Sequence, residues 1–529
     1  MNLQGNQYIG FTPSGAGQQV FQAINPVNGE KLIPFFKEAT DEEIALAGEK
    51  ASNAFQQYRL TSGAEKAHFL TLIAEHIEKL GDDLLQRCHL ETGLPLARIT
   101  GERGRTVGQL KLFAALLKEG SWVNASIDLA QSERQPLPKP DIRSMQTALG
   151  PVAVFGASNF PLAFSVAGGD TVSALAAGCP VIVKAHPAHP GTCEMIGMAI
   201  VNAAQEANMP DGVFSMVHGG PAVGMSLVNL IDIKAIGFTG SHAAGMAIFN
   251  ASMKREEPIP VYAEMGSVNP VFVFSEALEH HADRLAEGFV QAVNLGVGQF
   301  CTNPGVLIIE EGENCSPFIE KIKSIFSQIP GGSMLTEGIK NQFVKAIEAA
   351  KAEDDIEVVT LGQAASTFTG VTPTLLTVKA EAILHSNIQM EEIFGPSSII
   401  VVAKDVSQME ELAHFFSGHL TASLFGLNAG KTAQVRLVNV LTQKVGRLIV
   451  DGFPTGVEVC HSMVHGGPFP STTFAGSTSV GTSAIYRFTR PLCFQGFPHC
   501  LLPDELKDDN PLGIMRKIDG KYGAYFTNM

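Results

Sequence analysis

The chain has 529 residues, of which 45% are hydrophobic and 17% charged, and its formal net charge is −15. The length predicts two or three domains, and the excess of hydrophobic over charged residues excludes a disordered chain. Because there is no long run of Lys and Arg, no apolar run of membrane-spanning length and no signal-peptide pattern, we expect neither nucleic acid nor a membrane as a partner, and a cytoplasmic location.

The N-terminal part predicts helices over residues 41–58, 63–80 and 98–118, where apolar residues recur at helical spacing. A Thr or a Ser stands at the N-cap position before each of the first two. Residues 135–149 break this pattern. Their three prolines exclude a helix interior or a central strand, so we interpret the segment as an extended arm whose second half forms an edge strand.

From residue 151, short apolar strands alternate with helices, which is typical of a parallel sheet covered on both faces. The strand-like runs lie at 152–156, 181–185, 214–219 and 235–240, and the helices are expected at about 161–178, 190–207, 222–229 and 242–254. This pattern predicts an α/β fold of the dinucleotide-binding class. A second α/β unit is predicted by further runs at 270–274, 305–309, 397–403, 422–427 and 447–452.

The eight cysteines form no Cys-x-x-Cys pair and have no metal-like spacing to histidine. They predict free thiols in a reducing compartment, with neither a disulfide scaffold nor a metal site. One of them stands in a distinctive setting, because NLGVGQFCTNPG (294–305) places Cys301 in a glycine-rich turn that would leave a nucleophile accessible. Taken alone, such a cysteine is more often an inert buried thiol.

Two motifs could bind a phosphorylated cofactor. GFTGSHAAG (237–245) follows a strand and opens a helix, so Gly240 and Ser241 could bring helix N–H groups to a phosphate. Lys184 ends a predicted parallel strand, at the edge where open α/β sheets bind ligands. Each also has a plain structural explanation, either a glycine turn or a solvated lysine.

Two further residues suit catalysis. Asn159 precedes Pro161 at a strand-to-helix turn, where its amide could donate to an oxyanion or cap a helix that begins at the proline. Glu264, in the apolar run YAEMGSVNP (262–270), is either a functional carboxylate or a solvated one at a strand edge.

Together these motifs resemble the aldehyde dehydrogenase family, because they follow one order along the chain. The matching segments are ETGLP (91–95), ASNFP (157–161), VIVKAH (181–186), HGGP (218–221), GFTGS (237–241), AEMGSVNP (263–270), GQFCTNPG (298–305) and EEIFGP (391–396). The resemblance implies an aldehyde dehydrogenase-like α/β fold in a homodimer or homotetramer. It divides the chain into a Rossmann-type NAD(P)-binding domain (1–134 and 150–267), a catalytic domain (268–490), and an oligomerisation arm and tail (135–149 and 491–529).

The resemblance also implies a role for each matching residue. Cys301 would be the nucleophile, Glu264 the base that activates water, and Asn159 an oxyanion donor beside the Cys301 N–H. The implied cofactor residues are Lys184, Gly220, Gly240, Ser241, Gly245, Glu392 and Phe394. The chemistry is oxidation of an aldehyde to a carboxylic acid through a thiohemiacetal and a thioester, with hydride transfer to the nicotinamide.

One segment departs from the family pattern. CHSMVHGGPFPST (460–472) contains His461 and His465, whose roles the sequence leaves open. This segment, the tail and PLPKPDIR (136–143) resemble a branch that includes α-ketoglutaric semialdehyde (2,5-dioxovalerate) dehydrogenases and NADP-dependent fatty aldehyde dehydrogenases. We expect the first activity, which converts 2,5-dioxopentanoate to 2-oxoglutarate, and keep the long-chain aldehyde as the alternative.

Cofactor and substrate preferences rest on fewer residues. Pro187 stands where NAD-preferring members often carry a glutamate that repels a 2′-phosphate, so we expect NADP, with NAD as the alternative. Arg105 could pair with a substrate carboxylate or, equally, bridge to Glu102. An apolar substrate channel would be lined by Phe113, Phe160, Phe300 and Phe453.

Two functions of other classes would use part of this residue set. A non-redox cysteine acyltransferase would need Cys301 and an oxyanion donor, but not Lys184 or Glu392. A binding protein without catalysis would need neither Glu264 nor Asn159. Because the chain carries both sets of residues, the dehydrogenase is favoured.

Overall fold

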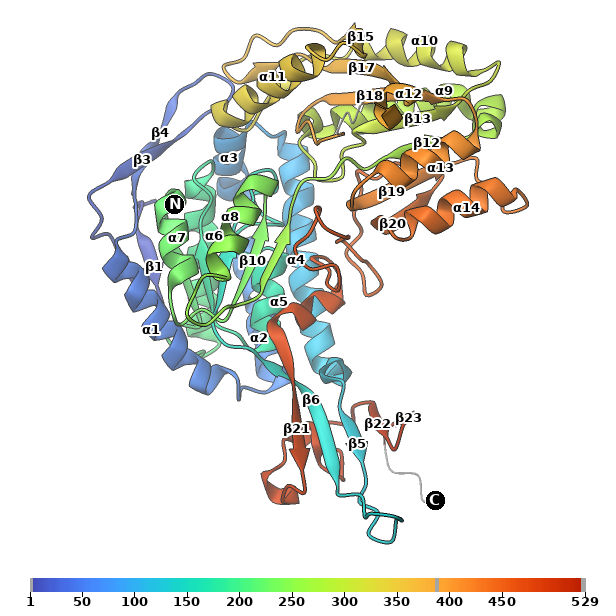
Figure 1. The fold of residues 1–529 in the computed structure, drawn as a ribbon. Coiled ribbons are helices and arrows are strands. Elements are labelled where there is room, and N and C mark those ends of the chain that lie inside the picture. Colours follow the sequence, from blue (N-terminus) through green and yellow to red (C-terminus); the bar gives the residue numbers. More distant parts are fainter. Residues whose placement is uncertain (1–2, 386–389, 525–529) are drawn as a thin grey trace.

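The computed structural model describes residues 3–385 and 390–524. Two α/β lobes lie side by side, and an arm projects away from one of them (Figure 1). Each lobe is built on a seven-stranded sheet, and the arm on a five-stranded sheet. The α/β fold expected from the sequence is confirmed.

The first sheet has the strand order β11-β10-β7-β8-β9-β1-β2 and is parallel from β11 to β9. Its strands are β1 (Gln7–Ile9), β2 (Thr12–Ser14), β7 (Val152–Phe155), β8 (Val181–Lys184), β9 (Phe214–Val217), β10 (Ala235–Thr239) and β11 (Val261–Glu264). Alternate residues enter opposite cores, with Val152 and Val154 on one side and Ala153 and Phe155 on the other. The sheet is therefore covered on both faces, which explains why its strands are continuous apolar runs.

Eight helices surround this sheet in the described chain. They are α1 (Asp41–Tyr58), α2 (Gly63–Lys79), α3 (Gly81–Thr92), α4 (Leu96–Glu119), α5 (Gly169–Ala177), α6 (Pro190–Glu206), α7 (Pro221–Asn229) and α8 (His242–Ser252). Thr40 and Ser62 cap α1 and α2, each in a reciprocal capping box with the glutamate three residues later. The sequence prediction missed α3, although Leu84, Leu85 and Cys88 lie at helical spacing and are buried.

The helix predicted from residue 161 begins later. Residues 161–168 form turns, and α5 starts only at Gly169. The reason is that the N–H groups of Leu162 and Ala163 donate to the Glu102 carboxylate, at 2.8 and 3.0 Å, instead of entering a helical ladder. Asn159 is therefore not the N-cap of a helix.

The second sheet has the order β15-β17-β18-β13-β12-β19-β20, and only β15 is antiparallel to its neighbour. Its strands are β12 (Val271–Val273), β13 (Val306–Glu310), β15 (Ile356–Leu361), β17 (Thr374–Lys379), β18 (Ser397–Ala403), β19 (His419–Phe425) and β20 (Val445–Val450). The flanking helices are α9 (Ser275–Asn294), α10 (Cys315–Phe326), α11 (Glu337–Lys351), α12 (Ala380–His385), α13 (Val406–Phe415) and α14 (Thr432–Leu441). Helices cover both faces here too.

The arm sheet has the order β21-β6-β5-β22-β23. Its strands are β5 (Ser126–Asp128), β6 (Ile142–Ala148), β21 (Thr489–Gln495), β22 (Arg516–Ile518) and β23 (Lys521–Gly523). The prediction of an edge strand was wrong, because β6 pairs with β21 on one side and β5 on the other. The prolines lie before β6, so they do not interrupt its ladder. Two two-stranded antiparallel sheets complete the described strands: the hairpin of β3 (Val20–Ile24) with β4 (Lys31–Lys37), and the pair of β14 (Gly332–Ser333) with β16 (Gly370–Val371).

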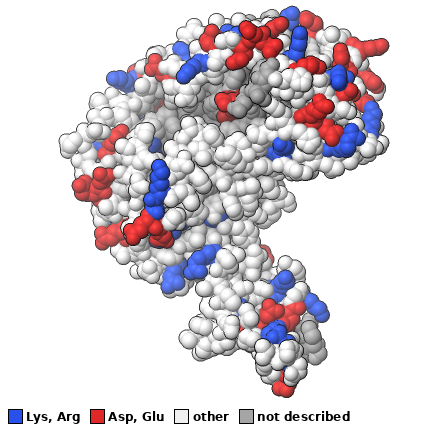
Figure 2. All heavy atoms as spheres, in the orientation of Figure 1, with Lys and Arg blue, Asp and Glu red and all other residues white. Residues whose placement is uncertain are grey.

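The surface gives no sign of a large single-sign patch on the face drawn in Figure 2, where acidic and basic side chains intermingle over the lobe of the second sheet. Among the helices of the described ranges, none has the length and apolar character needed to cross a membrane.

Candidate active site

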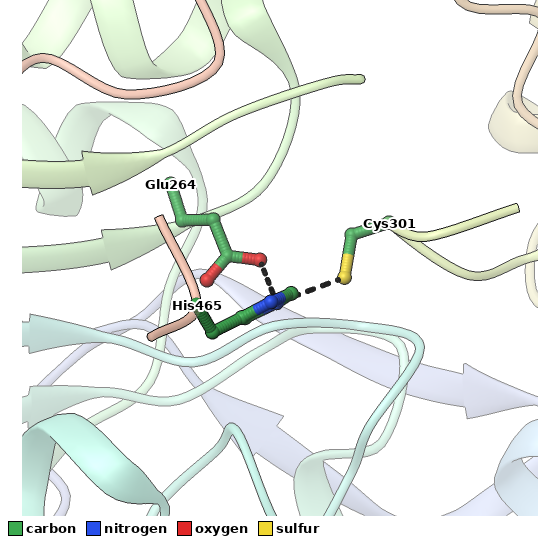
Figure 3. Close-up of side chains that lie close together, drawn as sticks. All are labelled: Glu264, Cys301 and His465. Atoms are coloured by element: carbon green, nitrogen blue, oxygen red, sulfur yellow. Dashed lines mark hydrogen bonds and ion pairs between the residues drawn. The ribbon is translucent and has the colours of Figure 1, made fainter. Parts of the chain in front are cut away.

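The site forms where opposite ends of the two sheets meet. From the first sheet come residues at the carboxyl ends of strands, since Glu264 ends β11 and Asn159 follows β7. From the second lobe comes Cys301, which precedes β13. Figure 3 shows the Cys301 thiol and the Glu264 carboxylate approaching one another from these two sides.

A left-handed turn presents Cys301. Gly296, Val297 and Gly298 all have positive φ values, between 57° and 66°, directly before it. A Cβ at Gly298 would lie 2.1 Å from the carbonyl oxygen of Gly395, so this position also requires glycine for close approach. Cys301 is partly exposed as a residue, and within the described chain its N–H has no acceptor.

Asn269 fixes the other side of this turn. Its Nδ2 donates to the carbonyl oxygens of Cys301 and Asn303, both at 2.9 Å. Its Oδ1 accepts from the hydroxyls of Ser267 and Thr421 at 2.8 and 3.0 Å. With its amide fully used, Asn269 binds the backbone around the cysteine and positions it.

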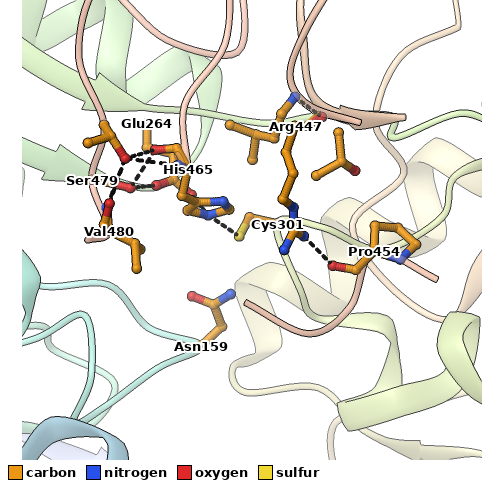
Figure 4. A network of polar contacts seen from close by, with 12 residues as sticks. Asn159, Glu264, Cys301, Arg447, Pro454, His465, Ser479 and Val480 are labelled. Atoms are coloured by element: carbon orange, nitrogen blue, oxygen red, sulfur yellow. Dashed lines mark hydrogen bonds and ion pairs between the residues drawn. The ribbon is translucent and has the colours of Figure 1, made fainter. Parts of the chain in front are cut away.

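His465 joins the cysteine and the carboxylate. Its Nε2 lies 3.5 Å from Cys301 Sγ and 2.9 Å from Glu264 Oε1 (Figure 3). The Ser479 hydroxyl donates to the other carboxylate oxygen, Glu264 Oε2 (Figure 4). Since Glu264 and His465 are almost completely buried, these contacts take place away from bulk water.

The contacts of His465 Nε2 allow it to act as a donor. An N–H on this nitrogen is positioned to donate to Cys301 Sγ and so to stabilise a thiolate. Glu264 Oε1 lies 2.9 Å from the same nitrogen but forms no hydrogen bond with it in the described structure. Because an ionised carboxylate can only accept, Glu264 is the group that can accept the thiol proton.

The charges in this cluster oppose one another. Burial raises the pKa of the Cys301 thiol well above its ordinary value, and the negative charge of Glu264 raises it further. Burial also works to raise the pKa of Glu264, but His465 and the Ser479 hydroxyl outweigh it, so that this pKa is lowered. Glu264 is thus ionised and ready to accept a proton, while the thiol is held mainly in its protonated form.

Asn159 lies beside the nucleophile turn. Its side chain is buried, and Nδ2 donates to the carbonyl oxygen of Gln299 at 3.1 Å. The backbone carbonyl oxygen of Asn159 accepts a hydrogen bond from Arg98 Nη2 at 2.7 Å. An amide nitrogen carries two N–H groups, so the second remains for an oxyanion formed at Cys301.

The sequence prediction assigned no metal, but the cluster consists of residue types that can bind one. Ligand atoms of Glu264, Cys301 and His465 lie within 4.8 Å of one another, close enough to share one ion. His461 is not part of this cluster. Its ring pairs with the Thr482 hydroxyl at 3.3 Å.

The predicted adenosine-binding residues gather around the end of β8. Burial lowers the pKa of Lys184 to about 8, against the opposing effects of Cys193 and Glu38. Gly220, the N-cap residue of α7, leaves space in which an added Cβ would meet Glu38 Oε1 at 3.5 Å. Pro187 lies exposed in the turn after β8. Glu38 is a carboxylate at this site that the sequence analysis did not identify.

The predicted pyrophosphate site lies at the start of α8. Gly240 and Ser241 are exposed between β10 and the helix, and the Ser241 hydroxyl caps the Ala244 N–H at 3.4 Å. Gly245 is buried, and a Cβ there would lie 2.7 Å from Met265 Sδ. The glycine therefore allows α8 to pack closely, and the exposed helix N-terminus can receive an anion.

Glu392 lies against Gly266, just after the end of β11. Its Oε2 would be 2.3 Å from a Cβ on Gly266, so the glycine admits the carboxylate. Burial raises the pKa of Glu392 to about 7, while a hydrogen bond from the Ser267 backbone opposes the shift. Phe394 is partly buried two residues later. An acceptor carboxylate, an ammonium group and an exposed helix N-terminus together fit the ribose and phosphate groups of a nicotinamide dinucleotide.

Two arginines of α4 sandwich a cluster of aromatic rings. Arg105 lies over Phe160 and Phe164, at 5.7 and 5.1 Å from the ring centres, and Arg98 lies over Phe160 and Phe300 at 5.1 and 4.7 Å. Within the described residues Arg105 forms no ion pair with Glu102, and its Nε and Nη2 are buried without an acceptor. This favours the substrate alternative over a structural bridge.

The predicted channel phenylalanines separate into different places. Phe160 and Phe300 meet edge to face at 5.2 Å, near the nucleophile. Phe453 packs on Phe425 in the second lobe, with ring centres 4.7 Å apart. Phe113 is fully buried in the core of the first lobe, so it does not line a channel.

The aldehyde dehydrogenase family model matches residues 11–486 of this chain. The chain belongs to the aldehyde dehydrogenase family. It is therefore an oxidoreductase of a family that uses NAD(P), and the acyltransferase and non-catalytic alternatives are set aside.

Two relatives match nearly the whole chain. α-Ketoglutaric semialdehyde dehydrogenase 2 of Azospirillum brasilense is 47% identical over 98% of this chain and 100% of its own length. The α-ketoglutaric semialdehyde dehydrogenase of Acinetobacter baylyi is 42% identical over 98% of each chain. Neither bears a fatty aldehyde name, so the long-chain alternative is not favoured.

Solved structures of other aldehyde dehydrogenases share the fold. PnpE from Pseudomonas sp. WBC-3 matches with a TM-score of 0.79 and 22% identity, covering 93% of this chain and 97% of its own. A betaine aldehyde dehydrogenase from Staphylococcus aureus, in complex with NAD+, matches with a TM-score of 0.80 and 19% identity, covering 94% and 98%.

Within this dehydrogenase, sequence reasoning missed three residues that contact the cluster or its supports: His465, Ser479 and Asn269. His465 carried a signal, because it stands in the segment that departs from the family pattern. Asn269 lay inside a matching motif but had no assigned task. Ser479 had no signal, since its approach to Glu264 spans 215 positions of sequence.

Proposed function

We propose that the protein oxidises α-ketoglutaric semialdehyde (2,5-dioxopentanoate) to 2-oxoglutarate, with Cys301 as nucleophile. The observation that carries the chemistry is that one buried imidazole nitrogen, His465 Nε2, lies close to both Cys301 Sγ and Glu264 Oε1. The substrate assignment is supported by the names of the two near full-length relatives and by the unpaired guanidinium of Arg105.

The first step is attack by sulfur. Glu264 accepts the thiol proton, the His465 N–H stabilises the thiolate, and Sγ forms a bond to the aldehyde carbon. The carbonyl electron pair moves onto oxygen. Donors to this oxyanion are the second N–H of Asn159 and the backbone N–H of Cys301, both of which are available in the described structure.

A bound nicotinamide dinucleotide supplies the acceptor for the hydride that leaves when the oxyanion collapses to a thioester on Cys301. Lys184, Ser241 and Glu392 would hold that cofactor from the ends of β8, β10 and the segment before β18. Once Glu264 has released its proton to solvent, it deprotonates a water that attacks the thioester carbon. The C–S bond breaks, and the carboxylic acid leaves the thiol behind.

The direct test is a substrate panel with purified protein. We expect kcat/KM for α-ketoglutaric semialdehyde to exceed that for decanal by at least about 100-fold, with formation of 2-oxoglutarate matching cofactor reduction at 340 nm one to one. Succinic semialdehyde and glycolaldehyde complete the panel. Decanal as the better substrate would overturn the assignment and restore the long-chain alternative.

For the cofactor, we propose that NADP is accepted and preferred, because Pro187 carries no charge that would repel a 2′-phosphate. Glu38 opposes this preference, since its carboxylate lies near Gly220 and acts on Lys184. The variant E38Q should therefore raise kcat/KM for NADP more than for NAD. A strong preference of the native protein for NAD would contradict the proposal.

The same proposal covers the organisation of the molecule. Residues 1–134 and 150–267 would form the cofactor domain, apart from β5 (Ser126–Asp128), which pairs in the arm sheet. Residues 268–490 would form the catalytic domain, and the arm and tail would hold together a cytoplasmic homodimer or homotetramer. Support comes from the arm sheet, which projects from the lobes (Figure 1), and from the exposed apolar side chains of Leu501, Leu512 and Tyr522 on the tail. Light scattering would measure the mass.

A further inference from the structure

Arg447 on β20 reaches the nucleophile from the second sheet. Figure 4 shows its guanidinium next to Cys301, on the side away from His465. Nη1 and Nη2 donate to the carbonyl oxygens of Gly456 and Pro454, each at 2.8 Å. These two bonds fix the plane of the guanidinium and hold the loop after β20 against the site.

This arginine has no counter-ion. In the described chain no carboxylate pairs with it, and its Nε is buried without an acceptor. Burial lowers its pKa, and the charged group that opposes this is Cys301. Arg447 is partly buried, and its buried Nε–H lacks an acceptor, which is costly and is relieved when an anion binds there.

Arg105 presents a second unpaired guanidinium, from α4 of the first lobe. Its Nε and Nη2 are buried without an acceptor, and the charge of Cys301 acts on it as well. Unlike Arg447, it also feels the charges of Glu102, Glu264 and Glu458. The nucleophile thus has a partly neutralised cation from one lobe and an uncompensated one from the other.

We propose that Arg447 is a substrate-binding residue that holds the 2-oxo-carboxylate end of the aldehyde, together with Arg105. The inference rests on the proposed function, because it assigns the acidic end of that substrate to a named partner. In 2,5-dioxopentanoate four bonds separate the aldehyde carbon from the carboxylate carbon, a span of about 5 Å when extended. A guanidinium beside Cys301 is within reach of such a carboxylate.

A guanidinium can do this while anchoring its loop. It has five N–H donors in one plane, and only two are engaged with Pro454 and Gly456. A bidentate pair with a carboxylate uses two of the others. A lysine would lack this fork, so the arginine serves both the loop and the substrate.

The test compares acidic and neutral aldehydes in R447M and R447K, with R436M as matched control. Arg436 lies on α14, half exposed, and pairs with Glu410 far from the nucleophile loop. We expect R447M to lower kcat/KM for α-ketoglutaric semialdehyde by about 10- to 100-fold, mainly through KM, and that for pentanal by less than about 3-fold. R447K should fall between, and R436M should match the native enzyme.

A binding measurement guards against a folding defect. In the native enzyme 2-oxoglutarate should compete with pentanal, and R447M should raise its Ki by about 10-fold or more. Equal losses for both aldehydes, with an unchanged Ki, would overturn the inference and leave Arg447 as a loop anchor only. Values of kcat/KM that stay unchanged in R447M for both aldehydes would also overturn the inference. If instead the native enzyme itself fails to prefer acidic aldehydes, the proposed function fails, which the native assay shows before any variant is made.

Discussion

The two sheets contribute to the site from opposite ends. In the first sheet the functional groups stand at the carboxyl ends of parallel strands, with Lys184 ending β8 and Glu264 ending β11. In the second they stand at the amino ends, with Cys301 before β13, Glu392 before β18 and Arg447 early in β20. The active site thus lies between the carboxyl ends of the first sheet's strands (the carboxyl edge) and the amino ends of the second sheet's strands (the amino edge).

This difference has a physical consequence. Strand ends are fixed by the ladder, as Glu264 is by β11, so groups placed there need little further support. Groups before a strand lie in turns and must be held by other side chains, as Asn269 holds the Cys301 turn. The rule that open α/β sheets bind ligands at their carboxyl edge describes only the first sheet. Substituting functional side chains of each edge in turn tests how both sheets contribute to the site.

The largest effect is expected on the amino edge. The variant C301A should lose at least about 10⁴-fold in kcat, because no other group can form the thioester. Cofactor reduction at 340 nm measures this, and cofactor binding by fluorescence should stay near native. As a control, C315A removes a buried thiol of α10 and should keep its activity. Turnover by C301A near the native rate would exclude this nucleophile.

On the carboxyl edge, E264Q should reduce steady-state turnover by about 10²- to 10⁴-fold. The defect should lie chiefly in thioester hydrolysis, so that a rapid burst of reduced cofactor remains visible in stopped flow at high pH. Removing the Glu264 charge should also lower the pKa of the Cys301 thiol, since that charge raises it. Alkylation by iodoacetamide would then reach its full rate at lower pH than in the native enzyme.

Substitutions of Asn159, which also belongs to the carboxyl edge, test how the oxyanion is stabilised. N159A should lower kcat by about 10²- to 10³-fold, because one of two oxyanion donors is lost. N159D is the matched variant of equal size and should be at least as damaging, since a carboxylate repels the oxyanion. Single-turnover rates separate this effect from cofactor binding. Full activity in both variants would remove Asn159 from the chemistry.

His465 comes from neither edge, but from the segment after β20. H465L should lower kcat by about 10- to 100-fold and shift the pH profile of thiol alkylation upwards, because a donor to the thiolate is lost. H465Q can supply an amide N–H and should recover part of the activity. If His465 served only for packing, the pH dependence of thiol alkylation would be the same in both variants as in the native enzyme.

The smallest effect concerns Glu392. Because burial raises its pKa to about 7, its carboxylate should become neutral as the pH falls through that value and bind the cofactor less well. We expect KM for NADP to rise a few-fold between about pH 8 and pH 6. In E392Q the KM should be higher throughout and independent of pH over this range. A native KM that stays flat would contradict the assigned role.

The sequence predicted the residues at the carboxyl edge of the first sheet better than the contacts between the two sheets. Short predicted strands followed by motif residues placed Lys184 at the end of β8 and Ser241 just after β10, because strand direction places them there. Glu264 was predicted only within an apolar run, and β11, which it ends, was not predicted as a separate strand. The start of α5 was misplaced, since Glu102, sixty positions away, accepts the N–H groups that a helix would have used. Local pattern carries no information about such a partner.

The contacts made by irregular segments were less predictable still. His465 stood out in the sequence, yet its contact with Cys301 spans 164 positions and depends on a loop with no periodic pattern. Arg447 sits within a strand-like run, where nothing indicated that its side chain would reach the nucleophile. The residues that complete the site therefore had to be found from tertiary contacts.

The most direct test of this account is to trap the acyl-enzyme in E264Q. The variant is mixed with NADP and α-ketoglutaric semialdehyde, quenched in acid and digested for mass spectrometry. We expect a 2-oxoglutaryl thioester on the peptide that carries Cys301, approaching one per chain, and its absence from C301A/E264Q. Formation of product without an adduct on Cys301, or an adduct on another residue, would contradict it.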